Sequence, residues 1–502
     1  MEPFAVQGNE HMMASRMVPV VNPDVSRGVG QSRLYMRYIS DIPADILYTI
    51  AQYVDSLREL VLVCKRWRNI ILFAPSLWTN IHIKFPAASK VSPCPGDLRP
   101  VRMARAALRR AGPTTKLSLH LEMHDISHNI SFATAVVHMI SSRGYQSIRE
   151  LTLDGNWFPL VFDTLPGSIS DLFSFLVGEW NSLLHLHLGV TPPLISTFDK
   201  VLLPFLDSVI STAPALQYIG ISAELLPLVE KKLSKKRSLI SLEVTRPFFS
   251  NEPFRFNMWP HIKSFKISTP SGYHYRTGSR LDLRAINPPS SAEGEISAFP
   301  LLTHASFVNH TLEFCSSLRL KLLTDLVLNR VKVHAPALHS VEMPLLRNLV
   351  AQKTREINCI VAPMLETLTI GPLPEPVNVG YYLSKWFSGD PLQLDPVHLD
   401  LRPIYRGSSF IDTTVPLASV YLLRRVERIS ISRLSVVRQP DRWKYRLLES
   451  VTDDDREATK HMVMLPKWKK MDLDGDGVPD WLWDIIIARK MAGSPIQLNF
   501  AD

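Results

Sequence analysis

Closely spaced histidines are the first side chains of this chain that could do chemistry. His185 and His187 alternate in one apolar run, and His120 and His124 lie in and just after another. Imidazole is a common zinc ligand, and alternating positions of a strand share a face. Two residues on one strand do not fix a third ligand, so we expect exposed or hydrogen-bonded histidines and predict no metal site.

A run of carboxylates near the end of the sequence resembles a calcium-binding loop. Asp472-Leu473-Asp474-Gly475-Asp476-Gly477 places carboxylates at loop positions 1, 3 and 5 and glycine at position 6, and Asp480 falls at position 9. An EF-hand needs a bidentate glutamate at position 12, where this chain has Trp483. We therefore predict that Asp472 to Asp480 is a structural turn between a strand and a helix over Val478 to Lys490.

Catalytic motifs are absent from the sequence. It has no G-x-S-x-G, P-loop, H-E-x-x-H or paired glycine-rich nucleotide turn. Cys64 stands beside Lys65 in an apolar stripe, which favours a small packed or docking side chain over a nucleophile. We expect a protein that is not an enzyme and needs no cofactor.

The composition predicts a soluble globular protein of the cytoplasm or nucleus. The 502 residues, 46% of them apolar, allow about two or three domains, and no apolar run approaches the roughly 20 residues of a membrane span. Four cysteines without zinc-type spacing suit a reducing compartment. The net charge of +9 includes two local basic clusters without a nucleic-acid-binding motif, so we expect solvated helix faces there and no nucleic-acid partner.

Three short helices are predicted over residues 40–83. Pro43 suits the first turn of a helix, and Ser56 with Glu59 has the form of a capping box that begins a second one. The dipeptide Ala74-Pro75 ends the helical run. A unit of about 40 residues cannot bury all the apolar side chains of these helices by itself. Part of the apolar surface should therefore be a docking face.

The apolar and basic residues of these helices form a pattern of their own, made by Ile42-Pro43, Ile46-Leu47, Ile50, Val63-Cys64-Lys65-Arg66-Trp67 and Leu77-Trp78. The pattern resembles the F-box, with mild departures at Ile42, where leucine is usual, and at the short link Asp55-Ser56. The resemblance implies docking to the Skp-type linker protein of a cullin–RING ubiquitin ligase. The implied linker contacts are Ile42, Pro43, Ile46, Leu47, Ile50, Val63, Cys64, Trp67, Leu77 and Trp78. The alternative is a helical cap that only seals the next domain.

From Lys116 onward, short apolar triplets recur between helical patterns. They begin at Leu151, Leu186, Ile219, Leu242, Phe265, Leu326, Leu368, Val397 and Ile429, and each follows another large apolar residue by three places. We predict degenerate leucine-rich repeats that stack into a curved α/β solenoid with a parallel sheet and outer helices. Separate β-rich domains are the alternative. Val341 and Leu349 lie so close together that one of them belongs to an insertion or to no strand.

The middle residue of each triplet should project from the concave face of the solenoid, because its neighbours point into the core. These residues are Thr152, His187, Gly220, Glu243, Lys266, Val327, Thr369, His398 and Ser430. The row mixes small, charged and imidazole groups, unlike the mostly apolar lining of a small-molecule pocket. We predict that a protein substrate of unknown identity binds there.

The chain is therefore divided into a disordered tail (1–37), an F-box (38–84), a linker with a joining helix (85–115) and the repeats (116–502). This combination resembles fungal F-box domain-containing proteins. The resemblance implies a substrate-recognition adaptor of a Skp–cullin–F-box ubiquitin ligase. Two alternatives are an F-box scaffold that binds the linker protein without delivering substrates, and a repeat protein that binds another partner.

Overall fold

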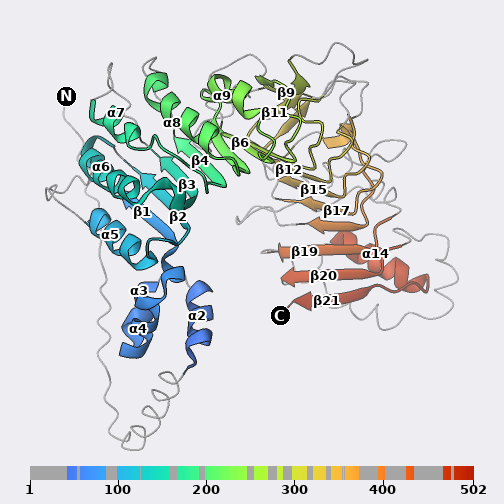
Figure 1. Cartoon of the computed structure of the whole chain (residues 1–502). Coiled ribbons are helices and arrows are strands. Elements are labelled where there is room, and N and C mark those ends of the chain that lie inside the picture. Colours follow the sequence, from blue (N-terminus) through green and yellow to red (C-terminus); the bar gives the residue numbers. More distant parts are fainter. Residues whose placement is uncertain are drawn as a thin grey trace, which may run out of the picture. The chain divides into compact units, whose positions relative to one another are not determined.

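The computed structural model describes most of the chain in separate segments. They are residues 42–53, 57–85, 99–124, 126–155, 157, 167–190, 198–245, 254–269, 280–286, 297–313, 320–334, 341–352, 354, 357–371, 394–401, 425–434, 467–475 and 480–501. The chain divides into two compact units (Figure 1). We call them the helical unit, described over 42–53, 57–78 and Arg110–Gly112, and the sheet unit, which holds the described residues of 79–109 and 113–501.

The helical unit holds the three predicted helices. They are α2 (Ala44–Tyr53), α3 (Leu57–Val63) and α4 (Lys65–Phe73), followed by the 3-10 turn η2 (Pro75–Trp78). Leu47 and Ala51 are four residues apart on α2, so they share a face, and both are buried. Trp67 and Ile71 repeat this spacing on α4 and are also buried. Together with Ala111 of the same unit, these four side chains are the apolar core of the described part of the unit.

Local hydrogen bonds fix the start and end of α4. The sulfur of Cys64, the N-cap residue, accepts a hydrogen bond from the backbone N–H of Trp67 at 3.5 Å. At the other end, the indole N–H of Trp78 donates to the carbonyl of Ile71 at 2.9 Å. Cys64 therefore has a structural role at a helix start, which agrees with the expected packed side chain. The predicted capping box begins at Ser56, which lies outside the described residues.

The sheet unit is built on a 15-stranded sheet in which every pair of neighbouring strands is parallel. In spatial order, which is also chain order, the strands are β1 (Asn80–Phe85), β2 (Leu117–Met123), β3 (Ile148–Gly155), β4 (His185–Val190), β5 (Tyr218–Ser222), β6 (Ser241–Thr245), β8 (Ser264–Ser268), β10 (His304–Val308), β12 (Asp325–Asn329), β15 (Asn348–Gln352), β17 (Thr367–Ile370), β18 (His398–Leu401), β19 (Arg428–Leu434), β20 (Lys470–Gly475) and β21 (Gln497–Ala501). The predicted parallel sheet is confirmed.

Helices connect the first strands of this sheet. The sheet unit has α5 (Arg99–Ala111, whose last two residues belong to the helical unit), α6 (Ile126–Arg143), α7 (Gly167–Ser174), α8 (Phe198–Thr212), α9 (Leu226–Leu233) and α14 (Asp480–Met491), with the 3-10 turns η3 (Tyr145–Ser147) and η4 (Ile357–Cys359). In Figure 1, α6, α7 and α8 lie along one side of the neighbouring strands β1 to β4. In the described part of the chain, no helix combines the length and the apolar character needed to cross a membrane.

Between β6 and β17 the described connections contain short strands instead of the predicted helices. The strands β7 (Phe254–Phe256), β9 (Arg280–Ala285), β11 (Thr311–Glu313) and β13 (Lys332–His334) form a second parallel sheet, and β14 (Val341–Glu342) pairs with β16 (Ile360–Val361). Val341 therefore lies in an insertion strand, and Leu349 lies in the main sheet.

The main sheet begins earlier than the predicted repeats. Ile81, Ile83 and Phe85 on β1 are buried and alternate with exposed residues, and β1 pairs with β2 along its whole length. This alternation is that of a strand with one face in the core. The end of the predicted F-box segment thus belongs to the sheet, and the predicted joining helix, α5, follows this first strand.

Candidate docking surfaces

Large apolar side chains stand in solvent on the helical unit. The exposed fraction is 49% for Ile46, 68% for Leu62, 47% for Val63 and 82% for Phe73. Ile46 occupies the face of α2 next to the buried Leu47, so neighbouring residues of one helix divide between surface and core. A small helical unit with this much exposed apolar area is typical of a protein that binds a partner.

The ten residues predicted to contact a linker protein divide into three groups. Pro43, Ile46 and Val63 are exposed; Ile42, Ile50, Cys64, Leu77 and Trp78 are half-buried; Leu47 and Trp67 are buried. The sequence pattern did not indicate Leu62 and Phe73, because each falls beside a helix end where periodicity does not define a face. Only the exposed and half-buried residues offer surface to a partner.

Trp78 is fixed at the end of the helical unit. Besides its hydrogen bond to the carbonyl of Ile71, its ring lies under the guanidinium of Arg110, whose central carbon is 4.5 Å from the ring centroid. Such a cation–π contact contributes about 0.5–1 kcal/mol at an exposed site. The hydroxyl of Tyr48 on α2 lies 2.5 Å from the Oγ of Ser76 in η2. These contacts hold η2 against the helices, so the half-buried face of Trp78 is preorganised.

Residues 39–84 match the family of F-box-like domains. The chain carries an F-box-like domain. This domain supports binding to a Skp-type linker protein and through it to a cullin complex. The match covers a small part of the chain, and the comparison with curated proteins found no match.

The sheet face opposite the buried apolar pairs carries one continuous row of side chains, which we call the central row. Cα pairing places in it His82, His120, Thr152, His187, Gly220, Glu243, Lys266, Ser306, Val327, Val350, Thr369, Asp400, Ser430, Asp472 and Asn499. All the predicted middle residues of the triplets lie in this row except His398. His398 lies on the same face of β18, but it pairs with Thr367 and Arg428, which are outside the row. Asp400 pairs with Thr369 and Ser430 and so occupies the row position on this strand. The row residue of β18 therefore lies between Leu399 and Leu401, and not between Val397 and Leu399 as predicted.

A chain of hydrogen bonds connects four strands in the first half of the central row. Nδ1 of His187 lies 3.0 Å from the hydroxyl of Tyr218, and this hydroxyl donates to Oε2 of Glu243 at 2.6 Å. The other carboxylate oxygen of Glu243 pairs with Nζ of Lys266 at 2.7 Å. Gly220 leaves room for these contacts, because a Cβ at this position would overlap the His187 ring.

The network shifts the pKa values of Glu243 and Tyr218. Burial raises the pKa of the Glu243 carboxyl, but hydrogen bonds from Lys266 and Tyr218 outweigh burial and hold the pKa below its ordinary value. Burial and the bond to Glu243 raise the pKa of Tyr218. The lowered pKa favours the ionised form of Glu243, and its ion pair with Lys266 leaves neither side chain as an unpaired charge for a partner.

Asp472 anchors a second network at the last strands. Its Oδ2 lies 2.5 Å from Nε of Arg428 on β19, and its Oδ1 accepts from Nδ2 of Asn499 on β21 at 2.8 Å. Burial raises the pKa of Asp472, but these donors outweigh it and lower the pKa below its ordinary value. The first carboxylate of the calcium-like run is thus engaged within the sheet. Residues 476–479 of the predicted turn lie outside the described residues.

Four exposed apolar side chains repeat at the turns that precede neighbouring strands. Leu301, Leu322, Leu345 and Met364 each lie three residues before the first residue of β10, β12, β15 and β17, with exposed fractions of 39–49%. In each turn the next residue donates its backbone N–H to the carbonyl three residues earlier, at 3.1–3.3 Å. We call these four side chains the turn stripe. The triplet pattern did not reveal it, because the stripe lies outside the triplets.

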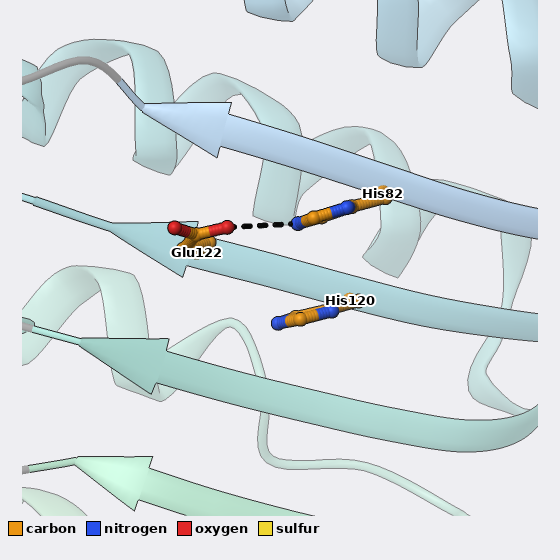
Figure 2. Close-up of side chains that lie close together, drawn as sticks. All are labelled: His82, His120 and Glu122. Atoms are coloured by element: carbon orange, nitrogen blue, oxygen red, sulfur yellow. Dashed lines mark hydrogen bonds and ion pairs between the residues drawn. The ribbon is translucent and has the colours of Figure 1, made fainter. Parts of the chain in front are cut away.

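A histidine cluster lies on β1 and β2, the first two strands of the main sheet (Figure 2). His82 on β1 pairs in register with His120 on β2, and their rings stack with centroids 4.2 Å apart and planes 6° apart. Nε2 of His82 lies 3.0 Å from Oε2 of Glu122. Burial, together with the neighbouring His82, lowers the pKa of His120. The four histidines considered in the sequence analysis separate into different places. His187 joins the network with Tyr218, His185 approaches Glu150, His120 stacks on His82, and His124 approaches Glu122.

Proposed function

We propose that this protein is a substrate-recognition adaptor of a Skp–cullin–F-box ubiquitin ligase. The match of residues 39–84 to the F-box-like family carries this proposal. The exposed apolar side chains of the same residues support it, because a docking domain must keep apolar area free until its partner covers it. Burial of that area contributes about 25 cal/mol per Å².

Within the domain, we assign linker contacts to the exposed and half-buried residues. Ile46 and Val63 are the main exposed anchors among the residues of the motif. Leu47 and Trp67 act through the fold, since each lies in the core of the helical unit. Leu62 and Phe73 extend the apolar surface beyond the residues of the motif.

We further propose that the sheet unit is a solenoid of degenerate leucine-rich repeats and that strands β10 to β17 bind a protein substrate. The charged groups of the central row at β6 and β8 pair with each other. At β10, β12 and β15 the row consists of the uncharged Ser306, Val327 and Val350, and the same strands follow the turn stripe. Half-buried uncharged groups on adjacent strands, preceded by exposed apolar side chains at the turns, suit the buried centre of a protein interface.

Co-purification from cells tests both parts of the proposal. The double variant Ile46→Asp, Val63→Asp should lose the linker protein and the cullin, because each substitution places a charge in a dry contact. The double variant Val327→Glu, Val350→Glu should retain linker and cullin but lose the proteins that otherwise accumulate when the proteasome is inhibited. Retention of linker and cullin by the first variant would refute the docking surface, and an unchanged partner set with the second would refute the substrate surface.

A further inference from the structure

The cluster of His82, His120 and Glu122 has the composition of a metal-binding site. One side-chain ligand atom from each residue lies within 4.8 Å of the other two (Figure 2). Two imidazoles and one carboxylate are a ligand set that binds zinc in proteins. The three residues come from only two strands, β1 and β2, whose parallel pairing is continuous over all six residues of β1.

The spacing of the ligand atoms is close to what one ion requires. Zinc binds nitrogen and oxygen at about 2.0–2.2 Å, which places ligand atoms of a tetrahedral site about 3.4 Å apart. Nε2 of His82 and Oε2 of Glu122 are already 3.0 Å apart. The side chain of His82 is 43% exposed and that of Glu122 21% exposed, so both have room to rotate toward an ion beside His120.

His120 supplies an independent observation. Its Nε2 is buried and has no hydrogen-bond partner among the described residues. A buried polar atom without a partner is unfavourable, so such atoms are usually satisfied by protein, water or an ion. In Figure 2 this nitrogen lies at the same end of its ring as the His82 nitrogen that contacts Glu122.

Lys84 competes for the carboxylate. Its Nζ lies 2.8 Å from Oε2 of Glu122, the atom that also approaches His82, and its side chain is 61% exposed. His124 approaches the other oxygen, with Nε2 3.3 Å from Oε1. A divalent ion at the cluster would displace the Lys84 ammonium into solvent, and His124 would continue to orient the carboxylate from the second oxygen.

We propose that His82, His120 and Glu122 bind one divalent transition-metal ion, of which zinc fits the ligand set best. The ion joins β1 to β2, and solvent occupies its fourth position. The site has a structural role: it attaches the first strand of the sheet, which follows the helical unit in the chain, to the second strand. Sequence spacing did not predict it, because His82 lies far from His120 in the chain.

Calorimetric titration of zinc chloride into the tag-free, metal-depleted full chain tests the site. We expect one zinc ion per chain with micromolar affinity. His82→Ala and Glu122→Gln each remove a ligand, so each should weaken binding by more than the roughly tenfold that loss of a second-shell partner can cost. Lys84→Gln should tighten binding several-fold. His185→Ala is the matched control, since it removes an imidazole that approaches Glu150 on the same sheet, and it should change affinity less than twofold.

A second readout keeps the test independent of folding. Cobalt(II) bound to the full chain should give visible absorption bands, and His120→Ala should abolish them while the melting temperature of the metal-free variant identifies any loss of structure. The proposal is wrong if zinc does not bind at one ion per chain. It is also wrong if His82→Ala, with an unchanged metal-free melting temperature, binds zinc as tightly as His185→Ala does.

Discussion

In the helical unit Phe73 is 82% exposed, whereas Phe265 and Phe307 in the sheet unit are almost completely buried. The apolar pairs of the sheet are buried, and every strand between β1 and β21 has a hydrogen-bonded neighbour on both sides. The helical unit has a core of five described residues and leaves Ile46, Leu62, Val63 and Phe73 exposed to solvent. Exposed apolar area in the sheet unit includes the repeated turn stripe. The contrast indicates that the helical unit is completed by a partner and that the main sheet stabilises itself.

The largest expected effect is a difference in the loss of stability caused by substitution of two adjacent residues of α2. Leu47→Ala should destabilise the helical unit by about 2–5 kcal/mol, because it opens a cavity in a very small core. Ile46→Ala should cost less than about 0.5 kcal/mol, because Ile46 is exposed in the free chain. Amide hydrogen exchange over α2 and α4 measures both. Equal losses for the two variants would mean that both side chains pack in the core and that the contrast between the units is false.

A buried carboxylate provides the corresponding test in the sheet unit. Glu230 is 8% exposed and accepts hydrogen bonds from the backbone N–H of Asn257 at 2.8 Å, from its Nδ2 at 2.6 Å and from Nε1 of Trp259 at 3.1 Å. Glu230→Ala leaves these donors without an acceptor, so we expect a loss of about 2–3 kcal/mol in chemical denaturation.

The matched control for Glu230 is an exposed glutamate of the same unit. Glu366 forms a surface ion pair with Arg347 at 3.2 Å. Glu366→Ala should change the free energy of unfolding by less than about 1 kcal/mol. If it costs as much as Glu230→Ala, burial does not explain the role of Glu230.

The smallest expected effect is the pH dependence of the stability that Glu243 in the central row contributes. The folded pKa of Glu243 is held below its ordinary value of 4.5, so its ion pair stabilises the fold above that pH and is lost as the pH falls through the folded pKa. Glu243→Gln should therefore cost about 1 kcal/mol at pH 7 and progressively less below about pH 4.5. Urea unfolding at several pH values measures the difference. A difference that grows at low pH would contradict the assigned charge state.

Most strands of the main sheet could be predicted, because a local apolar pattern marks each of them. A buried pair such as Leu151 and Leu153, with Ile148 three residues earlier, specifies a strand that faces a core. The strand β10 escaped detection because its inward pair is Ala305 and Phe307, and alanine is too small to complete an apolar triplet.

Pairing between strands could not be predicted in the same way. Register is set by partners distant in the chain, so Asp400 rather than His398 entered the central row. For the same reason, the pairing of His82 with His120 could be recognised only in the folded sheet. In the F-box-like domain, the resemblance implied that Ile46 and Leu47 both contact the linker protein, but packing of the helices divided them between surface and core.

Titration of the full chain with a Skp-type linker protein tests most directly whether the exposed apolar surface of the helical unit is a docking surface. Ile46→Asp and Met364→Asp form a matched pair, since the two native side chains have the same exposed fraction, 49%, in different units. We predict that Ile46→Asp raises the Kd at least about tenfold, equivalent to about 1.4 kcal/mol, and that Met364→Asp leaves it within about twofold. An unchanged Kd for Ile46→Asp, or an equal increase for both variants, would contradict the account.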